Sequence, residues 1–295
     1  MITQSFTMRH GAVLLATILF NSALFAEPLI LTNHPVTYQL TSRLVQQTAI
    51  KVENTAPLQL PSSRVTAYLT GRGSEMLKQQ AADATAVISL RSIWPNDPLY
   101  PLVRRHKINA IEIDAATPID GALPGIAVLN DEADVVAQQP WMDLINLGRM
   151  ADIVSADLQR LMPRDKAQID INLAQFKKEL LSQNTQSELE LSQIDNLTVL
   201  NLSDSLTYLL SSLNLDVLQL PSSLNSTSDS VQIGQFIDAE DIALIVYEGK
   251  LSNAMQDAIK YTQVKAIELK QDKVQPISNQ LKIRKELLLA LKNKQ

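Results

Sequence analysis

The 295-residue chain contains no cysteine and only three histidines, His10, His34 and His106. The absence of cysteine excludes disulfides, thiolate metal sites, a cysteine nucleophile and lipid attachment through cysteine. So few histidines exclude a zinc site built from several imidazoles. They also leave little material for the nucleophile–base pair that many hydrolases use.

Aromatic residues and unbalanced charge are scarce as well. Phe, Trp and Tyr make up 4% of the chain, which disfavours stacking platforms for sugars or unpaired bases. The 26 Lys and Arg oppose 31 Asp and Glu, for a net charge of −5. A nucleic-acid-binding protein normally carries a basic patch, so we expect no nucleic acid partner. Hydrophobic residues, at 45%, are sufficient for a folded core.

The N-terminus has the residue order of a secretory signal peptide. Arg9 precedes an apolar run from Gly11 to Phe20, and small and apolar residues lead to Ala26. This run is shorter than the roughly 20 residues of a spanning helix. We predict cleavage after Ala26 and a periplasmic protein without a membrane span. An uncleaved anchor is the alternative, because Leu24 is larger than the residue usually found there.

Short apolar runs alternate with helix-period stretches in both halves of the chain. Each run has the length expected of a strand covered on both faces. Strands joined through helices form right-handed crossovers and parallel sheets. The predicted strands are Leu29–Leu31, Ala49–Val52, Ala86–Leu90 and Ala110–Ile113, then Thr198–Leu202, Val217–Leu220, Ala243–Tyr247 and Val264–Leu269.

Helix signals lie between these runs. Val36, Leu40 and Leu44 share one helix face, and Ser252 is placed to cap a helix that contains Met255. The tail beyond Ile277 is amphipathic. Two stretches rich in turn residues, 118–140 and 221–230, indicate loops.

The middle of the chain has helical periodicity without a strand. Trp141–Met162 and Asp165–Leu181 are predicted helices separated by Pro163, and Phe176 lies in an apolar stripe of the second. We therefore predict an α/β fold of two lobes, each with a four-stranded, mostly parallel sheet, joined by a long connector helix. The expected parts are a signal peptide at 1–26, an N-terminal lobe at 27–140, a helical connector at 141–186 and a C-terminal lobe at 187–295.

No common catalytic motif is present. The chain lacks G-x-S-x-G, H-E-x-x-H, the Walker A loop and G-x-G-x-x-G. Gly71-Arg72-Gly73 indicates a turn, and His106 lies in a basic cluster typical of a solvated helix end. We therefore do not expect an enzyme.

Three stretches carry degenerate forms of a known set of motifs. Gln139-Pro140-Trp141-Met142-Asp143 is similar to a D-P-H-x-W-L-D-P motif, Ser203 to Tyr208 to H-D-A-F-x-Y, and Val246-Tyr247-Glu248 to F-x-E. With the two-lobe order, these motifs resemble the TroA-like zinc- and manganese-binding solute receptors of bacterial ABC importers. The resemblance implies an ABC transporter permease in the inner membrane as partner, and we expect the receptor to be a monomer.

The resemblance also implies a metal site whose ligands are changed here. The histidine positions hold Gln139 and Ser203, the late acidic position falls near Lys270, and the first ligand, expected near Tyr68–Gly71, has no histidine. Amides and hydroxyls bind these metals weakly, and a lysine ammonium repels a dication. We therefore expect no zinc or manganese site of the family type and no resident cofactor.

Ligands of parallel α/β folds lie beyond the carboxyl ends of the strands. This rule places five candidates at the inter-lobe cleft: His34, Gln139, Ser203, Asp204 and Glu248. A rewired site of His34, Asp204 and Glu248 could still hold Zn or Mn. Alternatively, His34 and Asp204 cap the helices that follow them. We expect Trp141 in the core between the lobes.

Two functions remain open. The first is a periplasmic solute-binding component of a metal-type ABC import system whose metal site is lost or altered. The second is an interaction protein on the receptor fold that binds no metal. The architecture favours the first, and the missing ligands favour the second.

Overall fold

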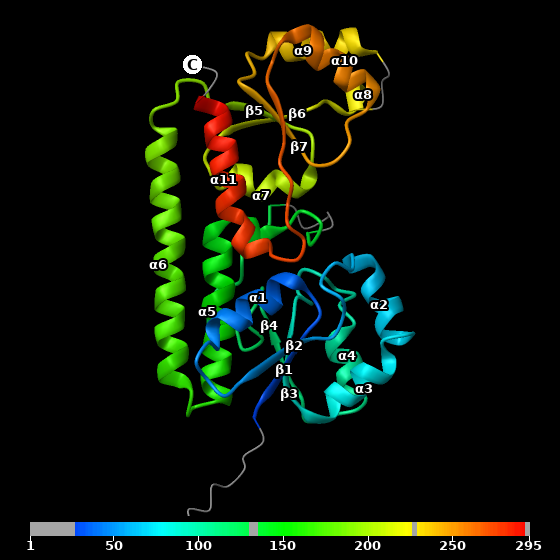
Figure 1. Cartoon of the computed structure of the whole chain (residues 1–295), viewed down its shortest axis with the longest axis vertical. Coiled ribbons are helices and arrows are strands. Elements are labelled where there is room, and N and C mark those ends of the chain that lie inside the picture. Colours follow the sequence, from blue (N-terminus) through cyan, green and yellow to red (C-terminus); the bar gives the residue numbers. More distant parts are fainter. Residues whose placement is uncertain (1–26, 130–134, 226–228, 293–295) are drawn as a thin grey trace, which may run out of the picture.

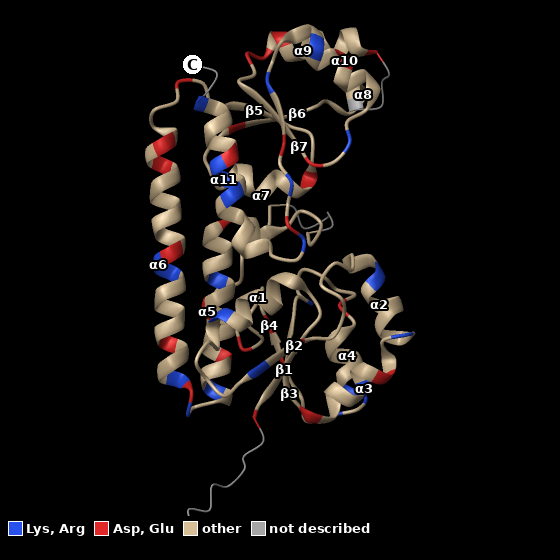
Figure 2. Cartoon of the chain, in the orientation of Figure 1, with Lys and Arg blue, Asp and Glu red and all other residues tan. Residues whose placement is uncertain are grey.

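The computed structural model describes residues 27–129, 135–225 and 229–292. Two α/β lobes lie one above the other along the long axis, and long helices run beside them (Figure 1). The predicted signal peptide, residues 1–26, lies outside the described residues. Figure 2 shows Lys and Arg interspersed with Asp and Glu over both lobes.

The first lobe is built on a parallel sheet in the order β2-β1-β3-β4. Successive side chains of the central strand β1 point to opposite faces, so Ile30 packs in one core cluster and Leu29 and Leu31 in another. The strands are β1 (Leu29–Thr32), β2 (Lys51–Asn54), β3 (Ala84–Ser89) and β4 (Ile111–Asp114); the helices are α1 (Pro35–Leu44), α2 (Ser62–Thr70), α3 (Ser74–Asp83) and α4 (Leu99–Arg104).

The second lobe repeats the order as β6-β5-β7-β8, again all parallel. The Ser252 hydroxyl accepts from the Met255 N–H at 3.2 Å, which confirms the predicted cap. The strands are β5 (Thr198–Asn201), β6 (Asp216–Gln219), β7 (Leu244–Tyr247) and β8 (Ala266–Glu268); the helices are η2 (Asp204–Leu206), α7 (Thr207–Ser211), α8 (Ser222–Asn225), α9 (Ser230–Ala239) and α10 (Asn253–Thr262). All eight predicted strands are confirmed, whereas α8 lies in a stretch predicted as loop.

Two long helices connect the lobes, preceded by the short turn η1 (Pro140–Met142). They are α5 (Leu144–Leu161) and α6 (Lys166–Leu191), packed side by side (Figure 1). The predicted connector helix is confirmed in place, but its end at Leu181 is wrong by ten residues, and α6 crosses the boundary expected at residue 186. The last turns are polar and are stabilised by side-chain hydrogen bonds such as that between Asn184 and Glu188 at 2.7 Å.

The last helix, α11 (Pro276–Lys292), returns from the second lobe and packs against α1, α6 and η1. At its start the Ile277 N–H donates to the Gln39 side chain of α1 at 3.0 Å. The amphipathic tail expected from the sequence is therefore a helix that covers part of the first lobe.

Among the described residues, the search for a helix both long and apolar enough to cross a membrane finds none.

Phe176 tests how far the connector depends on its apolar stripe. Its side chain is 4% exposed, and the Arg43 guanidinium of α1 lies 5.3 Å from its ring centre. Removing a buried aromatic ring leaves a cavity, so Phe176→Ala should lower the free energy of unfolding by about 3–5 kcal/mol. Leu181→Ala, on the same helix but 67% exposed, should change it by less than about 1 kcal/mol. Urea unfolding followed by circular dichroism measures both, and equal losses would contradict the packing.

Candidate functional site

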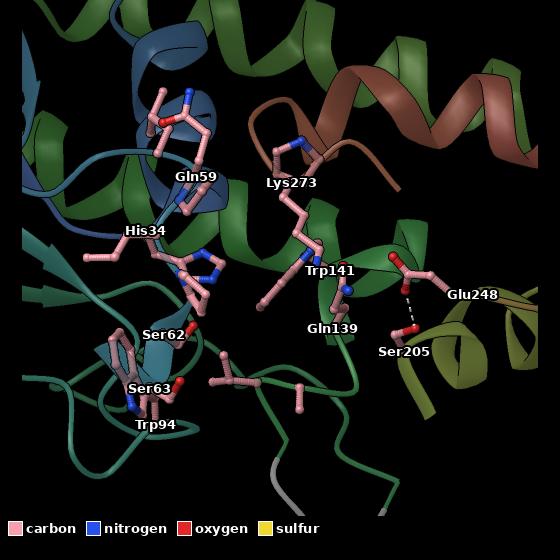
Figure 3. Close-up of a pocket in the computed structure, with 17 residues that line it drawn as sticks. His34, Gln59, Ser62, Ser63, Trp94, Gln139, Trp141, Ser205, Glu248 and Lys273 are labelled. Atoms are coloured by element: carbon pink, nitrogen blue, oxygen red, sulfur yellow. Dashed lines mark hydrogen bonds between the residues drawn. The ribbon is translucent and has the colours of Figure 1, made fainter. Parts of the chain in front are cut away.

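A cleft of about 430 Å³ lies between the lobes and is lined by residues of both (Figure 3). The first lobe contributes residues that follow β1, β2 and β3, and the second lobe contributes residues that follow β5, β7 and β8. The segment before η1 completes the wall. The cleft therefore lies where parallel α/β folds bind ligands, beyond the carboxyl ends of the strands.

Three of the five candidate residues line this cleft: His34, Gln139 and Glu248. Ser203 does not line the cleft, and its hydroxyl accepts from the Glu248 N–H at 2.8 Å. Asp204 is exposed in η2 and does not line the cleft. The rewired trio of His34, Asp204 and Glu248 is therefore not assembled around this cleft.

Ser205 faces the cleft instead. It lines the cavity, and its hydroxyl donates to Glu248 Oε2 at 2.6 Å (Figure 3). This bond orients the half-buried Glu248 carboxylate, which follows β7. The turn η2 reverses the chain directly after Ser203, so spacing along the sequence does not reveal which residue points inward.

His34 has two roles, one in the fold and one in the cleft. Its Nδ1 accepts from the Val36 N–H at 3.3 Å and caps α1, which confirms the capping alternative for His34. The same expectation for Asp204 was wrong, because the N-cap residues of η2 and α7 are Ser203 and Leu206, and neither helix has a side-chain cap. Burial lowers the pKa of His34 to about 4, so the imidazole is neutral at pH 7. Because Nδ1 is the acceptor, the proton of the neutral ring is on Nε2. His34 therefore presents an N–H donor, not a lone pair.

Both tryptophans of the chain pack against His34. The Trp141 ring centre lies 4.9 Å from that of His34, and the Trp94 ring lies edge-on at 6.4 Å. Trp141 is 2% exposed and belongs to the main core cluster, so the expectation of a core position is confirmed. Trp94 was not expected from the sequence, although its place after β3 was a signal that it could reach the cleft.

A buried carboxylate holds the loop that carries Trp94. Asp97 accepts from the N–H groups of Leu90 (2.9 Å) and Leu99 (3.0 Å) and from the Asn33 amide at 2.7 Å. Burial raises the pKa of Asp97, while these three hydrogen bonds oppose that rise. Asn33 is thus used to anchor this loop and does not reach the cleft lining.

The segment before α5 is held from both ends. Asp143 caps α5 by accepting from Ile145 N–H at 2.6 Å. From α11, the Gln280 amide donates to the Trp141 carbonyl, and Arg284 donates to the Met142 carbonyl at 3.0 Å. Gln139, which precedes this segment, has a left-handed backbone (φ 58°) although it is not glycine. The bonds from α11 fix the backbone of Trp141 at the cleft.

The cleft offers few groups of the kind that bind transition metals. His34 and Glu248 are the imidazole and the carboxylate of its lining, and within the described ranges no three His, Asp or Glu residues come together as a metal site. Tyr68–Gly71, near which the resemblance placed the first ligand, ends α2 and does not line the cleft. Residues 58–63, which follow β2, occupy that wall and contain no histidine.

A lysine does reach the cleft, but it is not the one expected. Lys270 pairs with Glu268 at 3.1 Å and does not line the cavity. Lys273, three residues later in the loop between β8 and α11, lines it and is exposed. Gln59, Ser62 and Ser63 were also missed, because no residue pattern marks the length of the loop after β2.

His34 should make the protein sensitive to mild acid. The unfolded imidazole titrates near 6.5 and the folded one near 4, so between these values the unfolded chain binds more protons and stability falls as pH falls. This contribution should cost about 2 kcal/mol of unfolding free energy between pH 7 and pH 5. Asparagine is a good cap that does not titrate. His34→Asn should therefore lose this part of the acid sensitivity in urea unfolding at the two pH values; an unchanged pH dependence would contradict the buried neutral imidazole.

The family model described as zinc-uptake complex component A, periplasmic, matches residues 75–283. A search of curated protein sequences finds no match.

Solved structures with the same fold are numerous. A crystal structure of ZnuA matches with a TM-score of 0.62 at 17% identity, covering 90% of this chain and 99% of that one. A FpvC mutant from Pseudomonas aeruginosa matches at 0.66, with 15% identity and coverage of 90% and 99%. The Zn(II)-bound ZnuA-like domain of Streptococcus pneumoniae AdcA matches at 0.60, with 16% identity and coverage of 90% and 98%.

These matches confirm the predicted fold and the family resemblance drawn from the degenerate motifs. The family is one of solute-binding receptors, not enzymes. Its model covers more than half of this chain. The chain belongs to the zinc-uptake complex component A family.

Proposed function

We propose that this chain is the solute-binding receptor of a metal-type ABC import system. It is exported to the periplasm, loses residues 1–26, captures its solute in the inter-lobe cleft and delivers it to a permease in the inner membrane. Family membership supports the receptor role. The cleft supports the site, because both lobes contribute polar side chains to one preformed cavity.

The same proposal holds that the metal site of the family is altered here. The observation that carries it is the hydrogen bond from the Val36 N–H to His34 Nδ1. A histidine that ligates a metal through Nε2 has its proton on Nδ1 and donates it to an acceptor. Here Nδ1 meets a donor, so ligation through Nε2 would place two hydrogens against each other and break the cap of α1.

Two other groups in the cleft also disfavour a metal site. Glu248 Oε2 is engaged by Ser205, and the Lys273 ammonium shares the cavity. A tight zinc site needs about four donors at about 2.0–2.3 Å. The Glu248 carboxylate and the His34 imidazole, which presents an N–H group and not a lone pair, do not supply four donors. The cleft is therefore proposed as a site for a solute other than a bare Zn²⁺ or Mn²⁺ ion.

Metal titration tests the altered site. Calorimetry with Zn²⁺ and Mn²⁺ near pH 7 should show no stoichiometric binding at nanomolar affinity, because several good ligands are absent and each change costs at least about 10-fold. The ZnuA-like domain of AdcA, whose crystal structure is Zn(II)-bound, is the positive control. Nanomolar binding by this chain that disappears in His34→Ala would instead establish a rewired metal receptor.

Export is tested by mass. Protein recovered from the periplasm should have the intact mass of residues 27–295, because the apolar run before Ala26 is too short to stay as an anchor. A protein that retains residues 1–26 and is found in the membrane fraction would show an anchor.

A further inference from the structure

The start of α2 opens into the cleft. Pro61, Ser62 and Ser63 all line the cavity, and Pro61 at the N-cap supplies no side-chain hydrogen bond to the helix. The first N–H groups of a helix have no partner within it and carry partial positive charge. An acceptor with negative charge would complete this end of the nine-residue helix.

His34 points to the same chemistry independently. Its side chain is 9% exposed and lines the cleft, and its only hydrogen bond to a described residue uses Nδ1. The Nε2–H group is therefore a donor without an acceptor among the described residues, and a solute in the cleft could supply one. Figure 3 shows the ring in the cleft between the serines of α2 and Trp141. The Nε2–H group of His34 and the N–H groups at the start of α2 therefore lie on the same wall of the cleft.

A cation from the second lobe faces this wall. Lys273 lines the cleft, and Figure 3 shows its side chain extending towards Trp141. Its neighbour Lys270 pairs with Glu268, whereas Lys273 forms no ion pair with any carboxylate of the described chain. An oxyanion in the cleft would pair with Lys273 and accept from His34 together.

Glu248 sets a second requirement. Ser205 occupies Oε2 of this carboxylate, which leaves Oε1 for a donor in the cleft. A solute with negative charge at both ends would be repelled at this point. A solute with an amino group at that end would form a charge-assisted hydrogen bond. The cavity of about 430 Å³ also has room for an organic skeleton, with Trp94 and Trp141 as apolar walls.

We infer that the cleft takes a small zwitterionic organic solute, with its oxyanion held by His34, the start of α2 and Lys273, and its amino group held by Glu248. This inference rests on the proposed function, because it names the solute of the same cleft.

The two tryptophans make the test direct. Trp94 and Trp141 are the only tryptophans in the sequence and both line the cleft, so intrinsic fluorescence of the full mature chain reports its occupancy. The probes are the common α-amino acids, the amines that lack the carboxylate and the acids that lack the amine. Aminophosphonates distinguish a phosphate-type oxyanion from a carboxylate. At least one zwitterion should give a saturable change, with both truncated analogues at least about tenfold weaker.

Matched variants locate the oxyanion. Lys273→Met should weaken binding of the same zwitterion by about tenfold, because the charge-assisted hydrogen bond from the ammonium to the oxyanion is lost. Lys270→Met is the control, since that exposed lysine lies in the same loop outside the cleft, and its binding should be unchanged. His34→Asn keeps the helix cap but withdraws the Nε2–H donor, so it should also weaken binding.

Failure of this inference and failure of the proposed function give different results. No saturable response to any zwitterion, equal binding of the amines, or full affinity in Lys273→Met would overturn the inference. A saturable response to a neutral solute such as glucose would overturn it and leave the receptor function standing. Nanomolar Zn²⁺ binding reported by the same fluorescence would overturn the proposed altered metal site itself.

Discussion

The hydrogen bonds from α11 to the turn before α5 fix the place where the two lobes meet. Gln280 donates to the Trp141 carbonyl, and Arg284 donates to the Met142 carbonyl and to the Ser212 hydroxyl. Arg284 is 2% exposed, and burial lowers its pKa to about 10, so the guanidinium stays charged at neutral pH. Carbonyl and hydroxyl oxygens, with the nearby Asp143, offset that buried charge.

The position of η1 determines the position of the cleft wall that Trp141 forms. Trp141 packs on His34, and His34 is held by its bond to the Val36 N–H at the start of α1. On the opposite side, the Tyr208 hydroxyl accepts from the Leu129 N–H at 2.9 Å and joins α7 to a loop of the first lobe. In the described part of the chain, hydrogen bonds between side chains and backbone groups therefore hold the walls of the cleft in register.

The sequence supports the fold further than the site. The inner strands β1, β3, β5 and β7 are largely apolar and buried, and α1 has its apolar residues Val36, Leu40 and Leu44 at helical spacing, so these elements follow from burial alone. The end of α6 does not, because hydrogen bonds between polar side chains carry no hydrophobic signal. His34 was found by its place after β1. Ser205 and Lys273 were missed, because the turn η2 and the loop before α11 decide which side chain faces inward, and periodicity cannot show that.

The position of α11 also bears on how the protein folds. Its contacts join residues far apart in sequence: 142 positions separate Arg284 from Met142, and 238 separate Ile277 from Gln39. A chain made from its N-terminus completes the strands of both sheets before this helix exists. The outer side of α1 and the turn at Trp141 then stay uncovered, and contacts of such long range form slowly. The packing of α11 on α1 and η1 is thus among the last steps of folding, and a chain that lacks this helix leaves apolar surface exposed to aggregation and proteolysis.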